Sequence, residues 1–586
     1  MAGLIAALLV LVAGLTLPGL RSGGSLSGLV AIPVAVALAT AGLAVFGVSA
    51  WSGLAAMFVV GQGVTLQLVQ AGNMVGYQHL MPAGEMLGSG RIWLAFLVLQ
   101  AAIVLAVWLR SRPLDRVQLR ADWRLFAVIG VAVLSGAALS RDPVRYGGEL
   151  VAAAVIAAVQ LANLALAVSL VPAHRLERWE RAFDRLLGDG AGGDTRIDRF
   201  VLLAAAWTVL VAGLLARFVY QAHPHVPDEV SYLIQARYFA AGRLTMPAPP
   251  VQSAFDLDLM TFEPAHWYSP LPPAWPSVLA IGVKLGVPWL VNPVLTGVVV
   301  LLAWLFVSDV YDRRTARLTT LLFCVSPWFL WMGASLMNHQ LSLACAMVAA
   351  LGVARARRPR ARRWPWLLAA GAALGVIAMN RPLEGLCLAI LLAAWAFASA
   401  PVHGIARRLA PVAIMATVSA LVASIQLAYN RLLTGSATAF PVMRYLSAQY
   451  GEGSNSLGFG PNRGFGWTGL DPLPGHGAVD VAINSALNAF LIDIELLGWS
   501  IGCLLPILVL LAWGRLRRPD RLMLIAGLGV VVAHAFYWFN GGPDFGARYW
   551  YLVLLPCLVL AVRGIQTVGE RLASRGDRLG PTRALA

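Results

Sequence analysis

The chain has 586 residues, of which 59% are hydrophobic and only 12% charged, with a formal net charge of +16. This composition excludes an ordinary soluble protein and predicts an all-α protein that crosses a membrane many times. The positive charge does not indicate nucleic-acid binding, because the basic residues stand in short runs between apolar segments, as is typical of positive residues kept in the cytoplasm.

The cysteines and the first apolar run allow two predictions, one about redox chemistry and one about processing. The five cysteines fall inside predicted spans and form no CxxC pair, so we expect neither disulfides nor a thiolate metal site. No basic segment precedes the first apolar run, so we expect a retained first span rather than a cleaved signal.

Six apolar segments come first and predict an N-terminal six-span module over residues 1–172. They lie near 2–19, 28–48, 51–71, 92–110, 124–140 and 148–171. A charged, glycine-rich segment, 173–198, predicts a cytoplasmic linker. Its first half is expected to form a surface helix with Trp179, Phe183 and Leu186 facing lipid.

A second series of apolar segments predicts a membrane core over 199–566 and brings the total to about sixteen transmembrane helices. These spans are expected near 200–220, 289–307, 315–335, 338–354, 364–379, 383–399, 408–429, 488–513, 521–539 and 547–565. The segment from Trp275 to Leu285 is too short to cross and is expected to dip in and return. Residues 567–586 are expected to form a cytoplasmic tail.

The arginine-rich turns all fall on one side if these spans alternate, and that side is expected to be the cytoplasm. Two long outer loops then remain, 221–274 and 431–487. Both are rich in proline, glycine and aromatic residues, and loops of such length are usually functional. We expect them to fold as a lid over a site.

The first outer loop contains HPHVPDEVSYLIQARYFAAGRLTMPAPP, with the adjacent acids Asp228 and Glu229. Apolar residues at helical spacing predict a helix that lies on the membrane surface. It is expected to start at Pro227 and Asp228 and to stop at Gly242.

Recurrent polar residues on the outer side suggest a wet cavity there. One reaction that these residues could perform is glycosyl transfer from a lipid phosphate, which needs few parts. A carboxylate can take the proton of an acceptor hydroxyl, and Asp228 or Glu229 is the candidate. Cations can hold the leaving phosphate, and Arg381, Arg548 and Lys284 are the candidates.

Further residues are expected to bind substrate: Glu384, Asn338, His339, Tyr232, His266 and Tyr549. Asp256, Asp258 and Glu263 could hold a divalent metal such as Mg or Mn, although a DxD match alone is weak evidence. Each candidate also has a structural interpretation.

Asp228 could be only a helix cap, and Arg381 with Glu384 only an ion pair. Asn338 and His339 could cap a helix, and Lys284 could extend to the membrane surface.

The segments PDEVSYLIQARYFAAGRL, WYSPLPPAWPSVLAIGVKLGVPWLVNP, NRPLEGLCLAI and GPDFGARYWYLVLLP resemble the membrane glycosyltransferases of the C-type (GT-C) fold. The nearest group is the bacterial protein O-mannosyltransferase and aminoarabinose transferase superfamily. The resemblance covers about 199–564 and implies transmembrane helices joined to interfacial helices in the first outer loop. It also implies a polyprenyl-phosphate sugar donor, an acid at Asp228 as the base or its neighbour, and Arg381 and Arg548 near the donor phosphate.

The function expected from the sequence is transfer of a sugar to a cell-envelope glycan, lipid or protein on the outer face of the inner or plasma membrane. One alternative is an oligosaccharide ligase or polymerase that uses a lipid diphosphate. Another is a lipid or sugar transporter, although no convincing repeat relates the two halves of the chain. The expected partners are the lipid-linked donor, the envelope acceptor and the bilayer, without nucleic acid.

Overall fold

The computed structural model describes residues 49–70, 78–111, 123–139, 142–188, 197–358, 362–398, 404–467, 475–542 and 544–585. These residues are mostly α-helical, with two small antiparallel sheets. Seven of the described helices are long and apolar enough to cross a membrane. The expected all-α membrane protein is therefore confirmed, while the total of about sixteen spans and the domain boundaries stay predictions. The spans at 2–19 and 28–48 lie outside the described residues.

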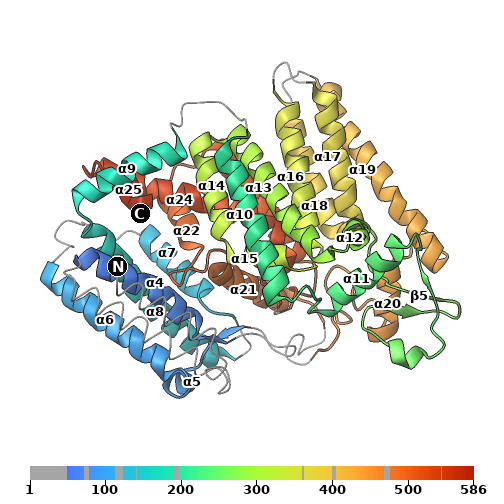
Figure 1. Ribbon diagram of the computed structural model, residues 1–586, viewed down its shortest axis with the longest axis horizontal. Helices are drawn as coiled ribbons and strands as arrows, with labels where there is room; N and C mark the ends of the chain where they lie inside the picture. Colours follow the sequence, from blue (N-terminus) through green and yellow to red (C-terminus); the bar gives the residue numbers. More distant parts are fainter. Residues whose placement is uncertain are drawn as a thin grey trace.

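The N-terminal part is a layer of helices beside the core, drawn in blue in Figure 1. It comprises α4 (Ala50–Leu66), β1 (Val69–Gln70), β2 (His79–Leu80), α5 (Ala83–Leu87), α6 (Arg91–Ser111), α7 (Trp123–Ser135) and α8 (Pro143–Ser169). Asp142 caps α8 by accepting hydrogen bonds from the backbone N–H groups of Val144 and Arg145. Within the layer, the buried amides of Gln100 and Gln160 hydrogen-bond to each other at 3.0 and 2.9 Å.

The predicted surface helix of the linker is present as α9 (Ala173–Leu187). Leu176 and Leu187 are buried on one side, and the ring of Trp179 packs against that of Trp51 on α4. The helix therefore contacts the N-terminal layer, and it also contacts α14 of the core, where Arg314 lies 3.3 Å from Asp184; Leu186 remains exposed.

The core is a helix bundle with one large cluster of buried apolar side chains, and polar residues are buried among its helices as well. It contains α10 (Arg199–Leu214) with the π-turn η2 (Leu215–Val219), α13 (Val291–Val310), α14 (Arg313–Val325), α15 (Pro327–Ala334), α16 (His339–Ala356), α17 (Arg363–Asn380), α18 (Pro382–Ala398), α19 (Ile405–Thr434), α21 (Ala478–Glu495), α22 (Leu505–Trp513), α23 (Arg518–His534), η5 (Arg548–Val553), α24 (Leu554–Ser574) and α25 (Gly580–Leu585). Trp304, Phe323 and Phe329 are fully buried at its centre. Glycine permits close helix contacts, since a Cβ on Gly352 would lie 2.6 Å from the carbonyl oxygen of Trp366.

Two predicted single spans are broken in the structure. The span expected at 315–335 divides into α14 and α15, because Pro327 cannot continue a helix and Ser326 caps the next one. The span expected at 488–513 divides into α21 and α22. Gly498 and Gly502 take positive φ between them, and the carboxylate of Asp493 accepts the N–H of Leu504 at 2.8 Å.

Both outer loops are folded, and they contact each other. The first holds α11 (Pro227–Ala240), the strands β3 (Met246–Pro247), β4 (Thr261–Phe262) and β5 (His266–Tyr268), the short turns η3 (Gln252–Phe255) and η4 (Pro288–Leu290) nearby, and α12 (Ala274–Lys284); the second holds α20 (Pro441–Tyr450). The strand order is β3-β5-β4. The Tyr445 hydroxyl accepts the N–H of Leu259 at 3.0 Å, and Arg444 lies 3.7 Å from Glu263. Figure 1 shows α11, α12, α20 and β5 together at one edge of the core.

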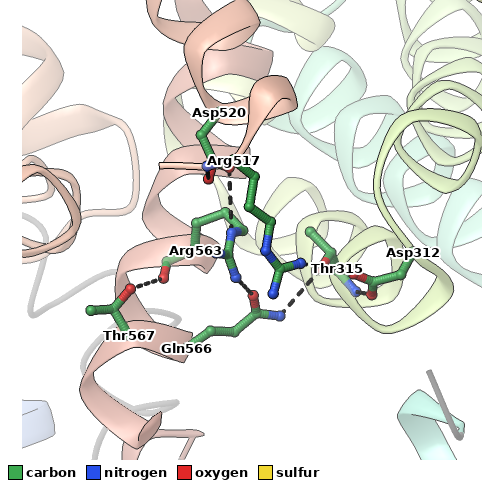
Figure 2. A network of polar contacts seen from close by, with 7 residues as sticks. All are labelled: Asp312, Thr315, Arg517, Asp520, Arg563, Gln566 and Thr567. Atoms are coloured by element: carbon green, nitrogen blue, oxygen red, sulfur yellow. Dashed lines mark hydrogen bonds and ion pairs between the residues drawn. The ribbon is translucent and has the colours of Figure 1, made fainter. Parts of the chain in front are cut away.

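A polar network joins the helix ends at the side predicted to face the cytoplasm (Figure 2). Arg563 on α24 lies 3.3 Å from Asp520 on α23, with both side chains buried, and donates to Gln566 at 2.6 Å. Gln566 in turn donates to Thr315 on α14 at 3.3 Å. Three helices are thus held in register by charges and amides that satisfy one another.

The N-terminal layer packs on the segment between α21 and α22. The Gln62 side chain accepts the N–H of Ser500 at 2.7 Å, and the Ser135 hydroxyl lies 3.4 Å from the carboxylate of Asp493. The break between α21 and α22 therefore forms the docking surface for the N-terminal helices.

Candidate functional site

The helix that carries the acidic pair begins where the sequence predicts. Pro227 is its first residue, Val226 before it is extended, and Gly242 follows its end with φ +74°. Because the residue before the helix is Val226 and no side chain caps its N-terminus, Asp228 does not act as the N-cap.

Glu229 is buried, and both of its carboxylate oxygens accept backbone hydrogen bonds. The donors are the N–H of His225 at 2.8 Å and the N–H of Leu336 at 2.6 Å. Burial raises the pKa of Glu229, while these two hydrogen bonds act in the opposite direction. With both oxygens occupied, Glu229 fastens α11 to the start of α16, and we assign it a structural role.

Asp228, the next residue toward the N-terminus, has a different environment. Its side chain is 31% exposed, and a carboxylate oxygen lies 3.6 Å from Nη1 of Arg548. The two carboxylates are adjacent in sequence, but only that of Asp228 is open to a substrate.

Arg548 is the first residue of η5, and its side chain is 9% exposed. Its Nε donates to the carbonyl oxygen of Gly541 at 2.5 Å. Gly541 takes φ +114°, and a Cβ there would lie 2.9 Å from Arg548 Cγ, so glycine allows this close approach. Nη1 of Arg548 has no hydrogen-bond partner among the described residues. One arm of the guanidinium is anchored by a hydrogen bond, and the other lies 3.6 Å from Asp228, beyond hydrogen-bond distance, so it can still donate to an anionic ligand.

Arg381 lies at the junction of α17 and α18 and donates from Nε to the buried carboxylate of Glu384. Its guanidinium carbon lies 4.7 Å from the ring centroid of Tyr549, and that of Arg548 lies 5.7 Å from the same ring. Tyr549 therefore brings together two guanidinium groups that come from distant parts of the chain.

His339, the first residue of α16, is 1% exposed, and neither ring nitrogen has a hydrogen-bond partner within the described ranges. Its ring stacks on Tyr549 with centroids 6.5 Å apart. The side-chain oxygen of Asn338 beside it also lacks a described partner, while its backbone carbonyl accepts from Asn380 at 3.0 Å. An unpaired buried polar atom costs about 1–3 kcal/mol, so several at one place favour a ligand site.

Tyr232 completes the group on α11, one helical turn after Asp228. It is 4% exposed, and burial raises the pKa of its hydroxyl, with the charge of Asp228 acting in the same direction. Arg381 and Arg548 act on the same hydroxyl in the opposite direction, which places Tyr232 within electrostatic reach of both.

The sequence reasoning missed two residues of this group. His534 and Tyr537, at the end of α23, pack on Tyr549 with centroids 6.1 and 5.6 Å apart. The Tyr537 hydroxyl donates to Asn455 of the second outer loop at 2.7 Å. The run AHAFYWFN, which ends at Asn540, was the available signal, because it places polar and aromatic residues at a span end.

The cluster around Tyr549 therefore unites eight of the predicted residues: Asp228, Tyr232, Asn338, His339, Arg381, Glu384, Arg548 and Tyr549. It does not include Lys284. This residue is exposed at the C-terminal end of α12, whereas Trp275 at the other end of the helix donates to the carbonyl oxygen of Leu336. It also does not include His266, which is exposed on β5 beside Thr245.

The candidate metal ligands are not gathered around one point. Asp256 and Asp258 are exposed, and Glu263 accepts from the Tyr268 hydroxyl at 3.1 Å and faces Arg444. Among the described residues, no group of three or more histidine, cysteine, aspartate or glutamate side chains could hold a metal ion. These residues do not fit a divalent metal site, and no step is derived through a metal.

Comparison with known proteins gives limited information. No family model matches the chain, and no curated protein matches it. The Archaeoglobus fulgidus oligosaccharyltransferase in complex with zinc and sulfate is similar at a TM-score of 0.38 and 16% identity, over 65% of this chain and 52% of that one. Its apo form gives a TM-score of 0.35 and 13% identity, over 66% and 54%. The chain spans about half the length of these structures, and at these scores the likeness assigns neither a family nor an activity.

Proposed function

We propose that the chain is an integral-membrane glycosyltransferase with a GT-C-like helix bundle. It moves a sugar from a polyprenyl-phosphate donor to an acceptor hydroxyl of a cell-envelope glycan, lipid or protein on the extracytoplasmic face. The observation that carries the proposal is the partly exposed carboxylate of Asp228 beside buried Arg548. Arg381 and Arg548 both contact the ring of Tyr549, so two guanidinium groups lie near this carboxylate. The sequence resemblance around PDEVSYLIQARYFAAGRL supports the same reading.

The two guanidinium groups suit a phosphate monoester better than a neutral ligand. Guanidinium holds phosphate oxygens through paired donors, and such charged hydrogen bonds are stronger when water is excluded. Nη1 of Arg548, which faces Asp228 at 3.6 Å, and the ring nitrogens of His339 have no hydrogen-bond partner among the described residues, so a ligand could supply one. Charge that develops on the leaving phosphate would be offset at this place.

Asp228 acts as the general base in the proposed step. Its carboxylate takes the proton of the acceptor hydroxyl, and the acceptor oxygen forms a bond to the anomeric carbon of the donor sugar. The bond between that carbon and the phosphate oxygen breaks, and its electron pair leaves with the polyprenyl phosphate. Attack from the side opposite the phosphate inverts the configuration at the anomeric carbon. A positioned base of this kind contributes roughly 10²–10⁴-fold to the rate.

The test is transfer from a radiolabelled polyprenyl-phosphate sugar by the purified full chain in nanodiscs, with an envelope extract as acceptor. Asp228→Asn is expected to reduce transfer by roughly 10²–10⁴-fold while the protein remains folded. Asp258→Asn is the matched control, because this exposed acid lies in the same loop outside the cluster, and it is expected to retain wild-type transfer.

Full transfer by Asp228→Asn would overturn the assignment of the base. Transfer from a lipid diphosphate, with none from the monophosphate, would instead favour a ligase or polymerase.

A further inference from the structure

A cavity of about 410 Å³ is lined in part by residues next in sequence to the cluster, and its lining contains none of the cluster residues. A volume of this size is typical of pockets that hold small organic ligands. The lining comes from the N-terminal layer, the core and the first outer loop: Leu66, Tyr220, His225, Val226, Pro327, Trp328, Trp331, Met332, Ile494, Glu495, Gly498, Asp544, Phe545 and Gly546.

Aromatic rings form much of the wall. Tyr220 packs edge-on against Trp331 at 5.6 Å and lies 4.9 Å from the ring of His225 and 6.3 Å from that of Phe545. The indole N–H of Trp328 donates to the carbonyl oxygen of Phe545 at 3.0 Å, which fixes that ring. Fixed flat rings present apolar faces suited to the C–H faces of a sugar ring.

Two carboxylates, Glu495 and Asp544, supply the acceptor atoms, and the described lining contains no lysine or arginine. A carboxylate accepts hydrogen bonds from hydroxyl groups and repels phosphate. Glycine at position 546 lets Glu495 come close, since a Cβ there would lie 2.1 Å from its Oε2. The cavity therefore suits a neutral or amino-bearing carbohydrate and opposes an anion.

Residues that line the cavity directly precede residues of the cluster in the sequence. His225 and Val226 directly precede α11, which carries Asp228, and Gly546 lies two residues before Arg548. In the cluster, Arg381 and Arg548 face Glu384 and Asp228, whereas the carboxylates of Glu495 and Asp544 line a cavity whose described lining has no arginine or lysine. This separation of charge is what two substrates of opposite character require.

We infer that this cavity binds the carbohydrate acceptor of the proposed transfer and that the N-terminal layer completes it through Leu66 on α4. The inference rests on the proposed function, and it gives the N-terminal helices a role in acceptor binding. Gln78 of the same layer does not line the cavity, but its side chain hydrogen-bonds to the carboxyl group of Glu495, which does. It docks next to the cavity through the contact of Gln62 with Ser500.

The test uses the full chain in nanodiscs and octyl glucoside with a photoreactive diazirine in its alkyl chain, with labelled peptides mapped by mass spectrometry. Labelling is expected at the cavity wall and is expected to be competed by free maltotriose. Trp331→Ala and Asp544→Asn, both at partly or fully exposed positions, are expected to reduce it about fivefold, the effect of one lost contact. Trp364→Ala and Asp256→Asn, exposed elsewhere, are the matched controls and are expected to label like wild type.

Leu66→Trp tests the contribution of the N-terminal layer by filling the cavity from α4. It is expected to reduce labelling to background, whereas Leu99→Trp, exposed on α6, is expected to leave it unchanged. Unchanged labelling in Leu66→Trp, Trp331→Ala and Asp544→Asn would overturn the inference, as would competition by octanol but not by maltotriose, which would indicate a lipid pocket.

Binding of polyprenyl phosphate is measured in the same preparations. If the phosphate binds and the glucoside does not label the cavity, this inference alone fails. If wild-type protein does not bind the phosphate, the proposed function fails.

Discussion

The two ends of α23, each with the part of η5 and α24 beside it, surround buried charge in different ways. At one end, Asp520 and Arg563 face each other with both side chains buried, and Gln566 takes a further donor of the arginine (Figure 2). At the other end, Arg548 keeps a buried Nη1 without a described hydrogen-bond partner, and the nearby ring of His339 has two unpaired nitrogens.

This difference separates a structural network from a candidate site. A buried pair with its hydrogen bonds satisfied holds helices together, and a buried polar atom without a partner lowers the stability of the fold. Unpaired atoms that collect around one tyrosine, next to a partly exposed carboxylate, are explained by a ligand that supplies their partners. The following predictions test this comparison.

The largest effect on stability is expected at the end of α23 where Asp520 faces Arg563. Arg563→Met leaves Asp520 charged and buried, which is expected to lower the free energy of unfolding by about 3–5 kcal/mol. Thermal denaturation followed by size-exclusion chromatography measures the loss. The double variant Arg563→Met with Asp520→Leu is expected to recover most of it, and a stable single variant would refute the structural role.

The matched change at the other end is Arg381→Met with Glu384→Leu. Replacement of both partners of a buried pair is near neutral for stability, so the protein is expected to fold. Its affinity for polyprenyl phosphate is expected to fall by about 1.5–3 kcal/mol, because a charged hydrogen-bond donor is lost. Binding to nanodiscs measures the affinity, and the double variant at Arg563 and Asp520 should retain it. Equal affinity for polyprenyl phosphate in the two double variants would show that Arg381 does not bind the donor.

His339→Phe is expected to have effects of opposite sign on stability and activity. Removal of two unpaired buried nitrogens is expected to raise the free energy of unfolding by about 1 kcal/mol, while sugar transfer falls. The comparison variant is His476→Phe, which loses the 2.9 Å contact of Nε2 with the carbonyl oxygen of Ala535 and is expected to be destabilised. A destabilised His339→Phe with full transfer would indicate that His339 is only a packing residue.

The smallest effect is expected where the two outer loops meet. Tyr445→Phe removes the acceptor of the Leu259 N–H and is expected to cost about 0.5–1.5 kcal/mol of local stability. Faster hydrogen exchange near Leu259, with a modest loss of transfer, is the expected outcome. Tyr146→Phe on the N-terminal layer should leave that exchange unchanged. If the Leu259 amide is as well protected in Tyr445→Phe as in wild type, the hydrogen bond does not couple the two loops.

The elements set by local composition could be predicted from the sequence. The limits of α11 follow from Pro227 and Gly242, and those of α12 from the shortness of its apolar run. The break at Pro327 was not predicted, because 315–335 was expected as one span, although the proline was a signal against an unbroken helix. The break between α21 and α22 was harder, because it depends on Asp493 capping a chain segment that looks apolar throughout.

The site could be predicted as a set of residues but not as a geometry. Alternation of the spans placed Asp228, Arg381 and Arg548 on one side, and the structure brings them together. The roles of the acidic pair could not be separated, because neighbouring carboxylates look alike until the fold gives Glu229 two backbone donors. The same holds for Tyr549, whose contact with both arginines depends on long-range packing.

The most direct measurement is a cryo-electron microscopy structure of the full chain with a non-hydrolysable polyprenyl-phosphate sugar. The account predicts the phosphate within about 3 Å of the guanidinium nitrogens of Arg381 or Arg548, with the anomeric carbon facing Asp228. A phosphate bound elsewhere, with Asp228 still paired to Arg548 and separated from the sugar, would contradict it.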